Sequence, residues 1–545
     1  MTTAAAVSTA ELDVAIVGAG FAGLYAVHRL RGLGLRVHAC ESAADVGGVW
    51  FWNRYPGARC DVESLQYSFS FSKELEQEWR WSERYAAAGE ILSYLQHVAD
   101  RFDLRRDISF NTQVLSAVFD EQADRWTLTT EGGQAIVARY LVMASGGLST
   151  ALLPDLEGLS SFKGRWFHTG KWPHEPIAFT GRRVGVIGTG SSGVQTVPAV
   201  AQQAQHLTVF QRTPNFSIPG RNCPLSDEAQ REWKARYAEH RRRAREIGTL
   251  YEFADRGALQ VSEAERRAEY QRRWDQGGVN FVHSFNDLMV NQQANDTVAD
   301  FVRERIRQTV KDPKVAELLS PYGHPLGTKR ICVDTGYFET FNRDNVTLVD
   351  VKADPIQRVT SSGIETAGAH HALDDIIFAT GYDALTGTML KIDVRGVGGL
   401  SLQDRWRHGP RTYLGLTVAG FPNMFAITGP GSPSALVNMV VGIEQHVDWI
   451  GDCLVHMRDN GYTRIDTDPA AEQRWGEHVN ATANRTLFPK ANSWYMGANV
   501  PGKTRMFMLY VQKIGIYRRE CDEIAAKGYE GLRLTRLAAA MPVPA

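Results

Sequence analysis

The chain of 545 residues is poor in cysteine and has no cysteine motif. Its six cysteines lie far apart, and no two of them form a CxxC pair. This spacing argues against a disulfide framework, a zinc site or a dithiol redox centre, so no metal site is expected. Most of the cysteines are expected to be small buried hydrophobic residues. A reduced, cytoplasmic location is the default expectation.

An excess of charge and a long apolar run are also missing. The formal net charge is −1, which gives no electrostatic basis for binding nucleic acid or an anionic membrane. No apolar run approaches the length that spans a bilayer. The first ten residues lack the basic start and apolar centre of a signal peptide, and a loose tail is expected there. The hydrophobic share of 43% is ordinary for a globular protein of two or three domains.

What the chain does contain is a glycine-rich loop directly after its first apolar run. Residues 13–17 (DVAIV) predict a buried strand, and the loop Gly18-Ala19-Gly20-Phe21-Ala22-Gly23 leads into a helical pattern. In a GxGxxG turn the glycines allow a tight turn, close approach of a pyrophosphate, and close packing of helix on strand. The next strand, 36–40, ends in Glu41, 18 residues after Gly23, where a carboxylate can bind ribose hydroxyls. This order predicts an FAD site.

A second loop repeats the pattern with one change. Residues 184–187 predict the strand, and the turn is Gly188-Thr189-Gly190-Ser191-Ser192-Gly193. The following strand, 207–211, ends in Arg212, 19 residues after Gly193, where no acid stands. An arginine there accommodates a 2′-phosphate, whereas a carboxylate would repel it. The second site is therefore expected to prefer NADPH over NADH, although a solvated surface arginine is the alternative explanation of Arg212.

The two loops predict an α/β fold with two Rossmann-like dinucleotide-binding domains, for FAD and NADPH, and a helical insertion in the NADPH domain. Strand patterns vanish between about 221 and 325, where Ser262 and Glu265 predict a capped helix start. The basic run 241–245 is interpreted as the solvated face of a helix. The expected division is FAD domain 1–146, NADPH domain 147–220, insertion 221–325, NADPH domain 326–384 and FAD domain 385–545.

Two further patterns allow a family resemblance to be named. FxGxxxHxxxWP(H/D) is matched by Phe162, Gly164, His168, Trp172, Pro173 and His174. GGxWxxxxYPGxxxD is matched by Gly47, Gly48, Trp50, Tyr55, Pro56, Gly57 and Asp61. With these patterns the chain resembles, over almost its whole length, the type I Baeyer–Villiger monooxygenases. The stretches KRICVDTGYFETFNRDNV and GPGSPSALVNM are similar to the phenylacetone and steroid monooxygenase branch. The turn 379–383 (ATGYD) resembles the family's return from the NADPH domain to the FAD domain.

The resemblance implies a reaction. NADPH reduces FAD, the reduced flavin and O2 form a C(4a)-peroxide, and the peroxide attacks a ketone. The resulting tetrahedral (Criegee) adduct rearranges to an ester or a lactone, and sulfoxidation is expected as a side activity. Because peroxide and adduct are anionic, a fixed cation should stabilise them by several kcal/mol.

The resemblance also assigns roles to single residues. Arg330 is expected to face the flavin, with Asp61 orienting it, and Lys329 is expected to bind the 2′-phosphate beside Arg212. The alternative for Arg330 and Asp61 is an ordinary ion pair on the protein surface. The expected cofactor-binding residues are Gly18, Gly20, Phe21, Ala22, Gly23, Glu41, Gly48, Val49, Trp50, Tyr55, Asp61, Tyr67, Gly188, Thr189, Gly190, Ser191, Ser192, Gly193, Arg212, Thr213, Lys329, Arg330 and Trp494. The expected substrate-facing residues are Val62, Gly147, Leu148, Ile331, Cys332, Ser434, Ala435, Leu436 and Met439, with Val49 beside them.

Three aromatic positions in the motifs receive roles by the same resemblance. His168 is expected in an interdomain linker with a structural function, and Trp172 is expected to pack. Trp494 is expected on a mobile loop that closes over nicotinamide and substrate, with Gly497 and Pro501-Gly502 as hinges. A core tryptophan is the alternative for Trp494.

The apolar and small wall residues imply a hydrophobic ketone. Gly147, opposite Ser434 and Ala435, is interpreted as leaving extra room for bulky aryl, cyclic or polycyclic ketones. An N- or S-oxygenating flavin monooxygenase is the alternative function, and a flavin disulfide reductase or NADPH oxidase is disfavoured by the absence of CxxC. O2 and the ketone are the expected partners of a monomer.

Overall fold

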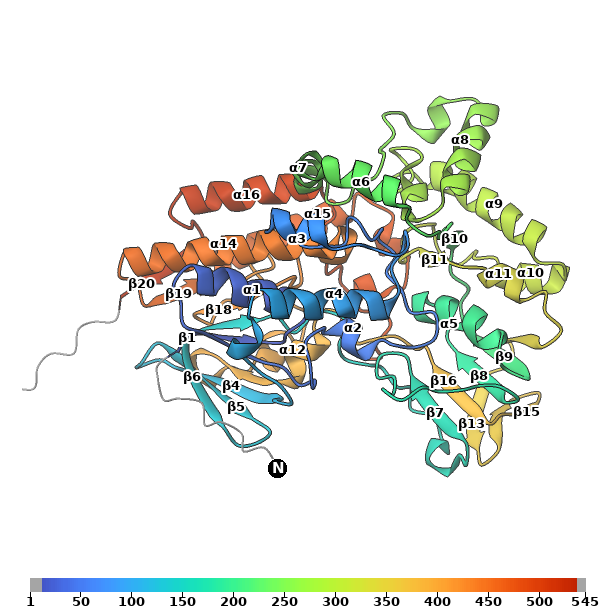
Figure 1. The fold of residues 1–545 in the computed structure, drawn as a ribbon, viewed down its shortest axis with the longest axis horizontal. Coiled ribbons are helices and arrows are strands. Elements are labelled where there is room, and N and C mark those ends of the chain that lie inside the picture. The colour runs from blue at the N-terminus through green and yellow to red at the C-terminus, as the bar shows by residue number, and fades with distance from the viewer. Residues whose placement is uncertain (1–11, 537–545) are drawn as a thin grey trace, which may run out of the picture.

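The computed structural model describes residues 12–536, and its architecture is the two-unit α/β fold that the glycine loops predict. The first ten residues, where a loose tail is expected, lie outside the described part. Figure 1 shows two sheets side by side, with the helices of residues 263–309 above the second sheet and those of residues 227–247 nearer the first unit.

The first sheet is built around β1, which carries the first glycine loop at its end. β1 pairs in parallel with β2 and β6, and a meander of β4, β5 and β6 extends the sheet on one side. The order is β17 (Asp393–Arg395), β4 (Val114–Asp120), β5 (Arg125–Thr130), β6 (Ala135–Met143), β1 (Leu12–Val17), β2 (Val37–Cys40) and β3 (Ile108–Ser109), and β18 (Met424–Ala426) also pairs with β6. Because β17 and β18 come from beyond residue 385, the C-terminal part of the chain completes this unit as the ATGYD turn predicts.

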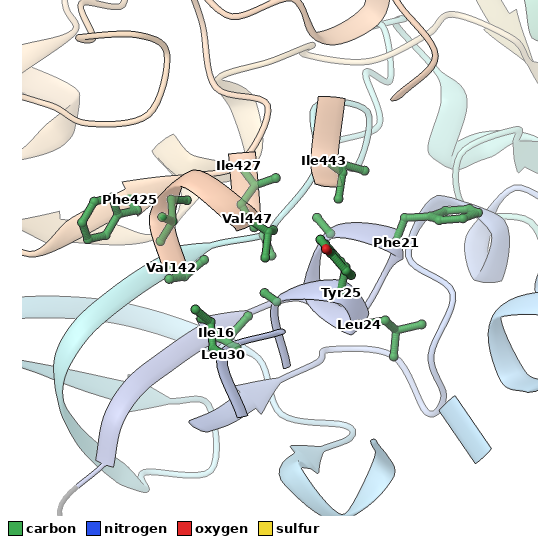
Figure 2. Close-up of a cluster of buried hydrophobic side chains, with 14 of the residues drawn as sticks. Ile16, Phe21, Leu24, Tyr25, Leu30, Val142, Phe425, Ile427, Ile443 and Val447 are labelled. Atoms are coloured by element: carbon green, nitrogen blue, oxygen red, sulfur yellow. The ribbon is translucent and has the colours of Figure 1, made fainter. Parts of the chain in front are cut away.

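The core of the first unit lies between β1, α1 (Phe21–Gly32) and α14 (Met439–Asp459). Figure 2 shows Tyr25 between α1 and Ile443, and Ile16 beside Leu30; these residues, Leu24 and Val447 are all buried. α14 starts at the capping residue Asn438, whose side chain accepts from the Val440 N–H, as expected for a helix that begins near this residue. The other helices and strands of this unit are α2 (Val49–Trp52), α3 (Lys73–Glu78), α4 (Ala88–Arg101), α12 (Gly387–Lys391), α13 (Leu402–Arg405), α15 (Pro469–Ala483), α16 (Ile514–Ala526), β19 (Arg464–Thr467) and β20 (Leu532–Thr535).

The second sheet is wholly parallel and carries the second glycine loop. Its strand order is β12 (Val346–Asp350), β9 (His206–Gln211), β8 (Arg183–Ile187), β16 (Asp375–Phe378) and β7 (Arg165–His168). α5 (Ser191–Ala201) and α11 (Tyr337–Thr340) lie beside it, together with the meander β13 (Ile356–Thr360), β14 (Gly363–Thr366), β15 (His370–Ala372) and the short pair β10 (Ser217–Pro219), β11 (Cys332–Asp334). Purely parallel sheets are buried on both faces, which explains the buried runs of the inner strands β9, β8 and β16.

Residues 221–325 contain helices and no strand, as predicted. They form α6 (Asp227–Ala235), α7 (Tyr237–Ile247), α8 (Glu263–Gln276), α9 (Gln292–Thr309) and α10 (Pro313–Leu319). The capping box of Ser262 and Glu265 is confirmed. Asp312 caps the start of α10, and Pro313 is the first residue of this helix.

The interpretation of the basic run as a solvated face is wrong for one of its members. Arg241 has a buried side chain, which donates to Glu76 at 2.7 Å and to the Ser68 hydroxyl at 2.8 Å. The other three arginines of the run are exposed. A charge run cannot show which of its members meets a buried carboxylate, and here α7 docks onto the first unit through this one.

Two connections between the units lie side by side. The segment after β6 and the segment after β16 pair through the bridge between Ala151 and Tyr382. Leu152 N donates to Gly381 O at 2.9 Å, and Leu385 N donates to Gly147 O at 2.8 Å. The chain therefore leaves and re-enters the first unit at one place.

Candidate functional site

The first glycine loop has a geometry that only glycine satisfies at two positions. Gly18 has a φ of +104°, and a Cβ there would lie 2.7 Å from the Ala144 carbonyl oxygen. A Cβ on Gly23 would lie 1.9 Å from the Gly18 oxygen. Helix α1 therefore packs onto β1 at its very start, and its N-terminal N–H groups are brought to the end of the sheet, where an anion is bound favourably.

The second loop has the same geometry and more free space. Gly188 has a φ of +108°, and a Cβ on Gly193 would lie 2.1 Å from the Gly188 oxygen. A Cβ on Gly190 meets nothing within 4 Å. At the equivalent Gly20 of the first loop, a Cβ would lie 3.3 Å from the Cα of Gly48, so the first loop is covered and the second is open.

Glu41 stands at the end of β2 with its carboxylate already bound by backbone. Its oxygens accept from Ala19 N at 2.7 Å and from Ala43 N at 2.8 Å, and only 5% of the residue is exposed. The acid therefore fixes the glycine loop as well as standing where a ribose would bind. Phe21, the first residue of α1, buries its ring in the core shown in Figure 2, so only its backbone faces the loop.

Arg212 lies at the end of β9 and is exposed. The charge of Arg212 acts on the half-buried Lys329. Burial lowers the pKa of Lys329, and the charge of Arg212 lowers this pKa further. Two cations held this close repel each other unless an anion lies between them, which is the charge pattern that a phosphate requires.

The GGxWxxxxYPGxxxD motif is explained residue by residue by contacts with other segments. Trp50 Nε1 donates to the Tyr67 hydroxyl at 3.3 Å. The Tyr55 hydroxyl donates to Gln195 Oε1 at 2.8 Å, and Gly57 lies so close to α5 that a Cβ would be 2.3 Å from the Gln195 oxygen. The motif therefore joins the first unit to the first helix of the second.

The FxGxxxHxxxWPH motif lies against the same junction. Gly164 permits close approach to the Asp374 carbonyl, because a Cβ there would lie 2.3 Å away. Trp172 is buried against Phe167, with ring centroids 5.1 Å apart, which confirms its packing role. The rings of His174 and Phe51 are 4.7 Å apart, so the two motifs contact each other.

His168 is buried and contacts the turn that returns to the first unit. Its Nδ1 accepts from Gly170 N at 2.9 Å, and its Nε2 lies 3.3 Å from the Thr380 hydroxyl. Burial lowers the pKa of His168, which keeps the ring neutral. These contacts support the expected structural function at the interdomain connection.

Arg330 and Asp61 form a two-point ion pair between the units. Arg330 Nε and NH2 each donate to one Asp61 oxygen at 2.8 Å, and NH1 donates to the Ala435 carbonyl at 2.9 Å. Burial opposes the charge of Arg330, but the charge and hydrogen bonds of Asp61 raise its pKa well above the usual range. Both side chains keep about a quarter or less of their surface exposed, 22% and 25%, so the alternative of a surface pair is wrong.

The sequence analysis did not identify two tyrosines that lie near Arg330. Tyr495 is 2% exposed; burial raises its pKa to about 12, although the charge of the Arg330 guanidinium opposes this rise in part. The charges of Arg330 and Asp61 both act on the pKa of Tyr251. Tyr495 follows Trp494 directly, so the motif around it was a usable signal, whereas Tyr251 lies in the insertion and carried none.

A polar cavity of about 470 Å³ adjoins the ion pair on the side of the insertion. Asp61, Tyr251, Glu63, Arg84 and Asn280 are among its lining residues. Glu63 is paired with Arg84 there at 2.6 Å. The carboxylate that orients Arg330 is therefore connected to a hydrophilic space that neither glycine loop lines.

The residues expected to face the substrate are brought together only in part. Ser434, Ala435 and Leu436 form one turn, joined to Arg330 through the Ala435 carbonyl, and Met439 starts α14. Leu148 is 38% exposed, whereas Ile331 and Cys332 lie in the core of the second unit. Cys332 Sγ accepts from Asn215 Nδ2 at 3.2 Å.

The space directly beside Gly147 is not empty. A Cβ there would lie 3.2 Å from the Leu385 side chain and 3.5 Å from its Cα. The neighbouring connection, which the sequence could not place beside Gly147, fills the space that the missing side chain would leave. The size of the substrate therefore does not follow from this glycine.

Trp494 lies half-buried in a short 3₁₀ turn, η8 (Trp494–Met496), against a cluster that includes Leu385 and Phe507. Gly497 and Gly502 on its C-terminal side have φ values of +66° and +76°. This placement at the edge of a cluster, beside two left-handed glycines, is compatible with both the loop role and the core alternative.

The donor sets of both loops fit dinucleotides. Strained glycines, helix N-termini, a buried acid in the first unit and a pair of cations in the second are the groups that bind pyrophosphate, ribose and a 2′-phosphate. Among residues 12–536 no cluster of three or more histidine, cysteine or acidic side chains could hold a metal ion. In the same range, every helix is too short or too polar to cross a bilayer. All six cysteines are free, and five of them are buried.

The comparisons with known proteins agree with this geometry. Residues 11–220 match the family model of flavin-binding monooxygenase-like proteins. A Baeyer–Villiger monooxygenase of Pseudooceanicola batsensis is 43% identical over 535 residues, which is 97% of each chain. A phenazine N-monooxygenase of Lysobacter antibioticus is 41% identical, over 96% of this chain and 97% of its own.

Solved structures are similar over the same length. An oxidized steroid monooxygenase bound to NADP is 53% identical, with a TM-score of 0.93, over 96% of this chain and 100% of that one. This similarity agrees with the resemblance to the steroid monooxygenase branch.

Proposed function

Because this chain belongs to the Baeyer–Villiger monooxygenases among the flavin-binding monooxygenase-like proteins, we propose that it converts hydrophobic ketones to esters or lactones with O2. FAD in the first unit and NADPH in the second would supply hydride transfer and the activation of O2 when bound. The observation that carries the proposal is the two-point ion pair of Arg330 and Asp61 at the junction of the units.

The residues of the first unit hold FAD. The α1 N-terminus would bind the pyrophosphate, with Gly18, Gly20 and Gly23 allowing its approach, and Glu41 would bind the ribose. The segment from Gly47 to Tyr67 covers this site and ends in the tyrosine that pairs with Trp50.

The residues of the second unit hold NADPH. The open face of Gly190 would admit the pyrophosphate at the start of α5, and Arg212 with Lys329 would bind the 2′-phosphate. The loop residues Thr189 and Thr213 are tied together by a bond of 3.0 Å from the Thr189 hydroxyl to the Thr213 carbonyl.

Arg330 stabilises the negative charge that develops on oxygen during the reaction. Three hydrogen bonds fix its guanidinium before any charge forms, so little reorganisation is needed at that moment. Asp61 keeps Arg330 charged and oriented and does not itself transfer a proton. The apolar turn at Ser434–Leu436 is proposed as the wall against the ketone.

N- or S-oxygenation is the second candidate function. The similarity to a phenazine N-monooxygenase over nearly the whole chain favours it specifically. The purified yellow protein, given NADPH, O2 and separate panels of ketones, sulfides and heteroaromatic amines, tests both candidates by mass spectrometry of the products. Ester or lactone is expected from ketones; N-oxide without ester would overturn the first proposal in favour of the second.

Protein without FAD and protein with NADPH but no organic substrate serve as controls. We further propose that the enzyme is a cytoplasmic monomer, which light scattering of the eluted protein and fractionation of cells would test. The division at residues 146, 220, 325 and 384 is retained as a proposal. It is supported because the strands change from one sheet to the other near 146 and 384, and because no strand lies between 221 and 325.

A further inference from the structure

The segment from Trp494 to Lys503 is fastened at one end to the return connection between the units. Lys503 Nζ donates to Asp383 Oδ1 at 2.6 Å and to the Ala384 carbonyl at 3.0 Å. Asn499 Nδ2 donates to the Tyr382 carbonyl at 2.7 Å. The side chains of the ion pair are 15% and 25% exposed, so the pair is better shielded from water than an ordinary surface pair.

The other end of this segment reaches Arg330. The charge of Arg330 opposes the rise that burial causes in the pKa of Tyr495, and the Tyr495 backbone oxygen accepts from Met508 N at 3.0 Å. The tyrosine ring belongs to an apolar cluster that includes Leu385 of the connection and against which Ala435 packs. The Ala435 carbonyl is itself 2.9 Å from Arg330.

The segment therefore links the return connection between the units to the surroundings of Arg330, which lie far from it in sequence. Its end at Lys503 is held by residues that connect the units. Its beginning at Tyr495 lies in the cluster against which Ala435 packs, and the Ala435 carbonyl accepts from Arg330. Gly497 and Gly502 have left-handed backbone and can bend the chain between these ends. A shift of the connection would be passed to Arg330 through this strap, residues 494–503.

We propose that Lys503 is a positioning residue, whose ion pair with Asp383 holds the strap in place and through Tyr495 keeps Arg330 in its active orientation. The inference rests on the proposed Baeyer–Villiger function for its catalytic consequence, but the fastening itself does not. When the strap loosens, Arg330 is less firmly placed, and NADPH, H⁺ and O2 give NADP⁺ and H2O2 in place of ester, NADP⁺ and water.

The first test measures the fastening without any reaction. Hydrogen exchange of the flavin-loaded protein, without NADPH or ketone, is followed by mass spectrometry for Lys503→Met, Asp383→Asn and the wild type. Exchange of the strap should become about fivefold faster in both variants, as for loss of one shielded ion pair. The control is Lys490→Met, because Lys490 is an exposed lysine of the same region that bonds Gln292 instead.

The second test measures the consequence for Arg330. With NADPH and a ketone that the wild type accepts, the share of NADPH that ends as H2O2 should rise at least about twofold in Lys503→Met, because the site retains less order. The KM for NADPH should stay unchanged, and Lys503→Arg should restore the product ratio, since it restores the charge.

The outcomes separate the two proposals. Unchanged exchange of the strap in both variants, or a product ratio equal to that of Lys490→Met, overturns the inference. A raised KM for NADPH with an unchanged product ratio also overturns it, because Lys503 would then contact the cofactor. Failure of the wild type to form ester from any ketone counts against the proposed function alone, since the exchange measurement still decides whether the strap is fastened by Lys503.

Discussion

The two nucleotide units share one loop geometry and differ in how the loop is surrounded. Gly23 and Gly193 stand equally close to the first glycine of their loops, at 1.9 and 2.1 Å from the carbonyl to a Cβ. The first loop is covered by Gly48 and bound by the buried Glu41, whereas the second has open space at Gly190 and ends near an exposed arginine. A closed, acid-lined site suits a cofactor that stays bound, and an open, basic site suits one that enters and leaves in each turnover.

The most damaging change removes the cation at which the two units meet. Arg330→Ala should lower ester formation by about two to three orders of magnitude, because a preorganised charge is lost and Asp61 is left without its partner. Flavin content and reduction by NADPH should persist. Product analysis and the rate of flavin bleaching under anaerobic NADPH measure these separately.

Arg343→Ala is the matched control, since Arg343 is an exposed arginine whose side chain donates to Asn345 Oδ1 at 3.1 Å. Ester formation by Arg330→Ala at the rate of this control would remove Arg330 from the mechanism.

The next change tests whether the closed and open loops differ as described. Gly23→Ala should cost about 1–3 kcal/mol of stability and release flavin, because its Cβ meets backbone that cannot move freely. Gly190→Ala should leave melting temperature and flavin content unchanged and weaken NADPH binding roughly tenfold, because its methyl group points into the space for the pyrophosphate. Thermal unfolding, flavin absorbance and NADP⁺ titration distinguish the pair, and equal flavin loss in both would contradict the comparison.

A third change addresses the charges of the open site. Arg212→Ala and Lys329→Ala should each raise the KM for NADPH about ten- to a hundredfold, the value of one charge-assisted phosphate contact, and leave that for NADH unaltered. Steady-state kinetics with both nucleotides measure this, and Arg242→Ala on α7 is the control. If both variants kept wild-type NADPH kinetics, the phosphate would have to bind elsewhere.

The smallest expected effect is on the stability of the fold at acid pH. Each half of the molecule contains a buried, neutral histidine that makes this stability depend on pH. Burial lowers the pKa of His446 on α14 and of His324 near Lys329 to about 3. Since these values lie below the unfolded value of 6.5, the unfolded state binds more protons between pH 6.5 and about 3, and stability falls as pH falls through that window. The slope should be about 1.4 kcal/mol per pH unit for each ring.

His446→Asn can still accept from Thr428 N, which donates to the ring at 2.9 Å, but it does not titrate. Denaturant unfolding at pH 5 and pH 7 should show a smaller loss of stability in this variant than in the wild type. An equal loss would mean that the ring is not neutral in the folded protein.

The sequence predicted most of the fold because its signals were local. Each glycine loop stands between a strand and a helix, and the positive φ of Gly18 and Gly188 is a requirement of that turn alone. The Arg330–Asp61 pair was predicted from two motifs. What the sequence did not reveal depends on contacts between distant segments: Leu385 filling the space beside Gly147, Arg241 meeting Glu76, and Lys503 meeting Asp383. No periodicity within a segment carries such pairings.

The paired connections at Ala151 and Tyr382 give the molecule a modular construction. The chain between these two positions leaves and re-enters the FAD-binding half at one place, so the NADPH-binding half is inserted into the FAD-binding half. The FAD-binding half completes its own sheet with β17 and β18, which follow the NADPH-binding half in the sequence. Exchange of residues 152–381 with those of a relative would therefore cut the chain at two neighbouring points. To transfer the nucleotide preference in this way, the exchanged part must keep Gln195, Arg241 and Arg330, whose partners lie in the FAD-binding half.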